Sequence, residues 1–60
     1  MIKLTDEERL LLEKLRRGPA RVFDDGVTAR PLHHGAIEYA GNDAWRLTEK
    51  GRAALKTGVL

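Results

Sequence analysis

The 60-residue sequence has no cysteine and no serine, and its only aromatic side chains are one Trp, one Tyr and one Phe. Without cysteine, neither a disulfide nor a thiolate metal site can support the fold. Without these nucleophiles or a glycine-rich phosphate loop, the usual catalytic arrangements cannot be built. A chain of this length buries only roughly 60% of the surface of its unfolded form. We therefore expect one domain spanning residues 1–60, stabilised by packing alone, that is not an enzyme and holds no cofactor or metal.

Long hydrophobic runs are missing as well. The longest is three leucines at positions 10–12, far short of the ~20 residues that a membrane span needs. Residues 1–12 also lack the charged-then-apolar order of a signal peptide. Both absences predict a cytoplasmic protein.

Charge of one sign is not in large excess. Eleven Lys and Arg against nine Asp and Glu give a formal charge of +2, which is too small to indicate nucleic acid by itself. The excess lies after residue 15, where eight basic and five acidic residues follow. Seven of the eleven cations are arginines, which suit phosphate groups and base edges. The charge pattern permits a DNA partner without identifying one.

The first helix is indicated by a capping box. In this motif the Thr5 hydroxyl accepts from the Glu8 backbone, and the Glu8 carboxylate accepts from the Thr5 backbone. It predicts a helix over residues 6–17, ended by the Gly-Pro pair that follows. Leu10 lies about 140° from the centre of the apolar stripe and does not belong to it. The stripe consists of Leu4, Leu11 and Leu15, with Leu12 at its edge.

Residues 20–34 have no clean period and allow two interpretations. In the preferred one, residues 20–23 form a short turn or strand, and Thr28 caps a short helix over residues 29–34 after an Asp-Asp-Gly turn. Pro31 then falls in the first helical turn, where its missing N–H has no partner to lose. In the other interpretation, the segments on either side of the Asp-Asp-Gly turn pair as a hairpin.

The last third of the chain predicts a β-hairpin and a helix. Two alternating runs, residues 36–39 and 44–47, are separated by turn-forming residues. Thr48 is placed to cap a helix over residues 49–56, which Gly58 ends. The side chains expected to face the core are Ile37, Tyr39, Trp45 and Leu47 from the hairpin and Ala54 and Leu55 from the helix.

Two stretches of the chain resemble the second half of small bacterial and phage winged-helix proteins. They are residues 27–39, VTARPLHHGAIEY, and residues 45–55, WRLTEKGRAAL. Those proteins have a short recognition helix, an exit into a hairpin wing, and a wing strand that runs into Leu-Thr-x-x-Gly. Here that motif is residues 47–51, in which the strand ends, Thr48 caps the next helix, and Gly51 permits close approach to the wing. The chain departs from them at Ala36, where Leu is usual, and at Pro31. A full helix-turn-helix also has about one more helix between the first helix and the recognition helix, where this chain has only residues 21–26. The resemblance implies an α+β fold: a miniature winged helix with a first helix, a short recognition helix, a β-hairpin wing and a C-terminal helix.

The resemblance also implies a small transcriptional regulator, of phage or mobile-element type, that binds double-stranded DNA. Arg30 is expected to contact a guanine. Asp24 and Asp25, just before the recognition helix, would repel phosphate. The candidate DNA-contacting residues are Thr28, Arg30, His33 and His34 on the recognition helix, Asn42 and Arg46 on the wing, and Arg16, Arg17 and Arg21 as a flanking basic patch.

Other chemistry for these residues is less favoured. His33 and His34 are adjacent, so on a helix they point about 100° apart and cannot chelate one ion without further ligands. Tyr39 and Trp45 could form a stacking platform for single-stranded nucleic acid. Because the chain has so few aromatic residues, we expect both rings in the core instead.

Two functions compete with DNA binding. One is a protein-binding module, an inhibitor or adaptor of a host protein on a winged-helix scaffold without DNA binding, which the small net charge and the acidic turn favour. The other is a structural component or a component of a toxin–antitoxin pair, on the same fold.

Three apolar residues have no evident place in the predicted core: Leu10, Val59 and Leu60. An open apolar surface is costly for so small a domain, and a twofold interface would bury it. These residues therefore predict a homodimer. The alternative is that Val59 and Leu60 fold back over Leu10 within one chain.

Overall fold

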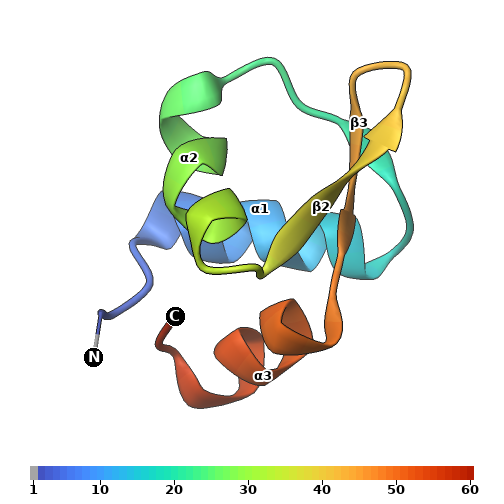
Figure 1. The fold of residues 1–60 in the computed structure, drawn as a ribbon. Coiled ribbons are helices and arrows are strands. Elements are labelled where there is room, and N and C mark those ends of the chain that lie inside the picture. Colours follow the sequence, from blue (N-terminus) through green and yellow to red (C-terminus); the bar gives the residue numbers. More distant parts are fainter. Residues whose placement is uncertain (1) are drawn as a thin grey trace.

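Three helices and a three-stranded antiparallel sheet make up the α+β fold of a computed structural model that describes residues 2–60 (Figure 1). In chain order the elements are α1 (Asp6–Arg16), β1 (Ala20–Arg21), α2 (Asp25–His33), β2 (Ile37–Gly41), β3 (Ala44–Leu47) and α3 (Glu49–Thr57). The predicted fold class is confirmed. None of the described helices is long and apolar enough to cross a membrane.

Helix α1 begins at the predicted capping box. The Thr5 hydroxyl accepts from the Glu8 N–H at 3.1 Å, and the Glu8 carboxylate accepts from the Thr5 N–H at 2.9 Å. The helix ends one residue earlier than predicted, because Arg17 is its C-cap. Leu12, expected at the edge of the apolar stripe, is fully buried at its centre, and Leu10 is 66% exposed.

Helix α2 begins four residues before the predicted start. Asp24 is the N-cap, with an extended backbone and a carboxylate that accepts from the Gly26 N–H at 3.0 Å. Thr28 is therefore not the cap; it lies inside the helix, and its hydroxyl donates to the Asp25 carbonyl at 3.3 Å. The short strand and helix of the preferred interpretation are present, and the hairpin of the other is wrong. Pro31 lies beyond the first turn, fully buried, so packing of its ring offsets the lost hydrogen bond.

The sheet has the order β1-β3-β2, so the hairpin strand β3 lies in the middle. The turn is shorter than predicted: Asn42 and Asp43 both have positive φ, 52° and 61°, as a two-residue hairpin turn requires. A register shift between Tyr39 and Gly41 adds one unpaired residue on β2, which is a β-bulge. In Figure 1 the hairpin extends beyond the helices at the upper right.

Helix α3 packs closely against the hairpin through a glycine. Thr48 caps the helix by accepting from the Gly51 N–H at 3.1 Å, and it also donates to the Gly35 carbonyl at 2.5 Å. Gly51 is buried, and a Cβ added there would overlap the Ala36 carbonyl oxygen and the Leu47 side chain. This confirms the close approach predicted for the Leu-Thr-x-x-Gly motif. Gly58 ends the helix in the left-handed region, as predicted, with α3 one residue longer than expected.

The hydrophobic core joins all three helices to the base of the hairpin. Trp45, Leu47 and Leu55 are half-buried against it. The placement of Tyr39 in the core is wrong: Tyr39, in the middle of β2, is 57% exposed. It packs against the edge of Trp45, with ring centroids 5.5 Å apart. The buried hydrophobic residues of this core cluster are Leu4, Leu11, Leu12, Leu15, Ala36, Ile37 and Ala54.

Candidate nucleic-acid interface

Helix α2 presents only some of the side chains that the sequence assigned to DNA. Thr28 is 4% exposed and its hydroxyl is bonded to its own helix, so its assignment as a DNA contact is wrong. The reason is the earlier start of α2, with Asp24 as its N-cap, which places position 28 inside the helix on a buried face. Arg30 is exposed, but its guanidinium is already engaged elsewhere.

Arg30 ties α2 to the start of α1. Its Nε lies 3.2 Å from the Glu8 carboxylate, and its Nη2 donates to the Lys3 carbonyl at 3.1 Å. The Glu8 side chain is only 6% exposed, so this ion pair is partly shielded from water. Arg30 therefore has a structural role that competes with contact to a guanine.

Arg30→Ala is expected to lower the free energy of unfolding by about 1–3 kcal/mol, because it leaves one oxygen of the shielded Glu8 carboxylate without its charged partner. Arg46→Ala is the matched control, since Arg46 also pairs with a glutamate, Glu38, but both side chains are about half exposed. It is expected to cost under ~0.5 kcal/mol. Urea unfolding of both variants measures the difference. Equal, small effects would show that the Arg30 pair is as solvated as the surface pair.

His33 and His34 lie at the end of α2. The rings form an edge-to-face pair with centroids 5.3 Å apart, and His34 is the C-cap. His33 is exposed and His34 half-buried. Across residues 2–60, no three His, Asp or Glu side chains are grouped to hold a metal ion.

The candidate residues of the sheet lie in two places, the hairpin turn and the outer face of β1 and β3. Asn42 is exposed in the turn at the tip. The register places Arg21 and Arg46 on the same outer face of β1 and β3, away from the face that carries Trp45. The Arg46 Nε lies 2.5 Å from the Glu38 carboxylate, so its charge is partly neutralised within the sheet.

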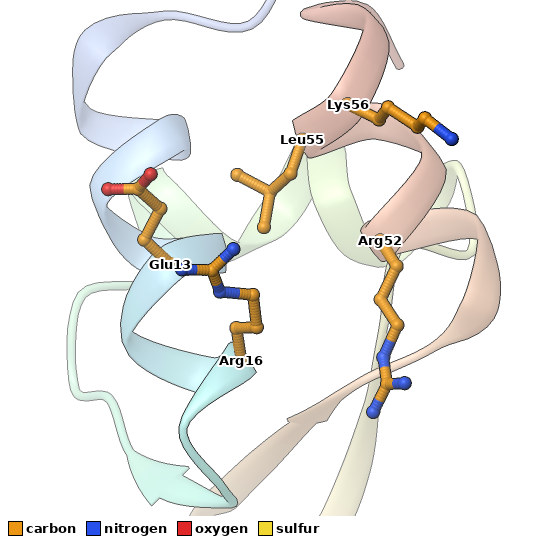
Figure 2. A pocket seen from close by; sticks show the side chains of 5 residues that line it. All are labelled: Glu13, Arg16, Arg52, Leu55 and Lys56. Carbon is orange, nitrogen blue, oxygen red and sulfur yellow. The ribbon is translucent and has the colours of Figure 1, made fainter.

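The basic patch at the end of α1 is larger than the sequence predicts. Arg16 and Arg17 are exposed there. Arg16 lines a cleft between α1 and α3 together with Arg52 and Lys56, which the sequence analysis missed (Figure 2). Their spacing, one helical turn apart on α3, is visible in the sequence. Only the packing of α3 against α1 brings them to Arg16.

The residues assigned to a dimer interface lie in two different environments. Leu10 is exposed on α1, as its position off the stripe predicts. The prediction that Val59 and Leu60 have no place within the domain is wrong. Val59 forms an isolated antiparallel β-bridge with Lys3, and the Leu60 N–H donates to the Ile2 carbonyl at 2.8 Å. Both side chains are half-buried. The last residues pair with residues 2–4 and do not cover Leu10, so the alternative in which Val59 and Leu60 fold back over Leu10 is wrong.

Comparison with known proteins returns no significant match to a protein-family model, to a curated protein or to a solved structure.

Proposed function

We propose that the chain is a small DNA-binding regulator of winged-helix type that holds double-stranded DNA mainly through phosphate contacts. The observation that carries the proposal is the arrangement of α2, which leads through three residues, 34–36, into the β2–β3 hairpin. This is the recognition-helix-to-wing connection that the sequence resemblance implies. The hairpin also extends beyond the helices, as a wing must to reach DNA (Figure 1).

The proposed contacts differ from those expected from the sequence. Thr28 is buried and the Arg30 guanidinium is bonded to Glu8, so base readout by α2 falls to His33. Asp24 and Asp25 at the start of α2 oppose a close approach of phosphate to that end of the helix. We therefore propose backbone-dominated binding of low sequence specificity.

We assign the phosphate contacts to exposed arginines and a minor-groove contact to the tip of the wing. Arg17 and Arg21 make no ion pair within 4.0 Å among residues 2–60, so their charge is free for phosphate. Arg46 shares the outer face of the sheet with Arg21 and would exchange Glu38 for phosphate. Asn42 at the tip is the candidate for the minor groove.

The test is a salt series of binding to a mixed-sequence duplex. If Arg17, Arg21 and Arg46 each neutralise one phosphate, the slope of log affinity against log salt is about −2.7. Arg21→Gln is expected to reduce its magnitude by about one unit. Lys3→Gln removes the same charge from the exposed N-terminal segment and is expected to leave the slope unchanged. An affinity that stays constant as salt rises would exclude the proposal.

A protein-binding module is the second candidate, and one observation favours it. Phe23 is 77% exposed and Tyr39 is 57% exposed, and aromatic side chains are enriched in protein interfaces. Two arginines expected to bind DNA, Arg30 and Arg46, are paired with carboxylates. The same salt series separates the candidates, because a partner bound through aromatic contacts need not weaken with salt. A homodimer through Leu10 stays a prediction in either case.

A further inference from the structure

The space between α1 and α3 is a cleft of about 510 Å³ with an excess of positive charge. Among residues 2–60, no ion pair within 4.0 Å involves any of its side chains. Figure 2 shows Leu55 pointing from α3 into the space between the helices and Arg16 on the α1 side of that space, while the Arg52 and Lys56 side chains extend from α3 away from α1. The lining residues are Glu13, Arg16, Arg52, Leu55 and Lys56.

Ordinary helix chemistry accounts for only part of this charge. Arg16 and Lys56 lie in the last turns of their helices, where cations are favoured. Arg52 lies in the middle of α3, where no such preference applies. Arg52 and Lys56 are four residues apart, and like charges at that spacing destabilise a helix. Arg16, across the cleft, adds a third positive charge, so an anion bound there would relieve repulsion.

We infer that the cleft between α1 and α3 binds a phosphate group carried by an organic molecule. The guanidinium groups of Arg16 and Arg52 supply forked donors that match phosphate oxygens. Leu55 supplies an apolar wall for the attached sugar or base. Glu13 is the one carboxylate in the cleft and lowers its affinity for anions. The phosphate can come from a free nucleotide or from a nucleic-acid backbone, and the cleft does not require DNA binding by α2 and the hairpin.

The experiment titrates the ¹⁵N-labelled full chain with adenosine monophosphate at constant salt and follows the Arg side-chain Nε–H signals by NMR. The signals of Arg16 and Arg52 are expected to shift with millimolar or tighter affinity. Arg52→Gln is expected to weaken binding by about tenfold, since it removes a charge-assisted contact. Glu13→Gln is expected to tighten it several-fold, an effect that misfolding cannot produce. Lys3→Gln, which also removes one positive charge but lies outside the cleft, is the control and is expected to leave nucleotide affinity unchanged.

A second arm repeats the measurements with the duplex. Weaker duplex binding by Arg52→Gln identifies the nucleic-acid backbone as the phosphate source, and an effect confined to the mononucleotide identifies a free ligand. If Arg52→Gln alters the mononucleotide and no variant alters the duplex, the cleft stands and the proposed DNA binding fails. The inference is overturned if the Arg16 and Arg52 signals do not respond to the mononucleotide, or if Lys3→Gln weakens its affinity as much as Arg52→Gln does.

Discussion

Leu12→Ala is expected to leave the chain largely unfolded at 25 °C. The Leu12 side chain is fully buried at the centre of the core, among residues from all three helices and the hairpin. Truncating a buried leucine to alanine costs about 2–5 kcal/mol, because apolar contacts are lost and a cavity remains. A single core in a domain of this size rarely supplies more than ~3–5 kcal/mol in total. Circular dichroism during urea unfolding measures the loss.

The control for Leu12→Ala is Leu10→Ala, the same substitution two positions earlier in the same helix. Leu10 is 66% exposed, and substitutions at such positions usually stay within ~0.5 kcal/mol. We expect this variant to unfold at the wild-type urea concentration when both proteins are measured at concentrations too low for a dimer through Leu10 to form. Similar midpoints for the two variants would contradict the placement of Leu12 at the centre of the core.

Gly51→Ala is expected to destabilise the fold by about 1–3 kcal/mol, although alanine normally stabilises a helix over glycine by ~1 kcal/mol. The added Cβ would overlap the Ala36 carbonyl oxygen and the Leu47 side chain. The carbonyl cannot move away freely, because it accepts from the Thr48 N–H at 3.0 Å. The variant must therefore separate α3 from the hairpin or distort the end of β3.

Lys50→Ala is the matched control, since it places alanine at the neighbouring, exposed position of α3. It is expected to change the free energy of unfolding by under ~0.5 kcal/mol. Thermal unfolding of both variants, compared with the wild type, measures the two changes in stability. A Gly51→Ala protein that melts above the wild type would mean that α3 does not pack closely against the hairpin.

Local signals predicted the ends of α1 and α3 to within one residue. The capping box of Thr5 and Glu8, the Thr48 cap and the Gly58 stop each act within a few residues, so neighbouring chemistry alone determines them. The two-residue turn at Asn42 and Asp43 was harder to place, because the bulge after Tyr39 shifts the register of the strands.

The start of α2 shows where local signals are insufficient. Asp24 and Thr28 are both good N-cap residues, four positions apart. With Asp24 as the N-cap, the helix includes residues 25–28, and Thr28 and Pro31 are buried in the fold. With Thr28 as the N-cap, residues 25–28 would lie outside the helix. The choice depends on packing between α2 and α1, which neither residue signals in the sequence.

Sequence alone determined the order of the elements, the caps of α1 and α3, and the need for glycine at position 51, because these depend on neighbouring residues and on the close approach that one motif implies. Tertiary structure decided which charged groups are free. It paired Arg30 with Glu8, set Arg16 across a cleft from Arg52, and left Tyr39 beyond the core. The physical reason is that the partner of a long side chain lies on another element, and only the packing of those elements brings the two together.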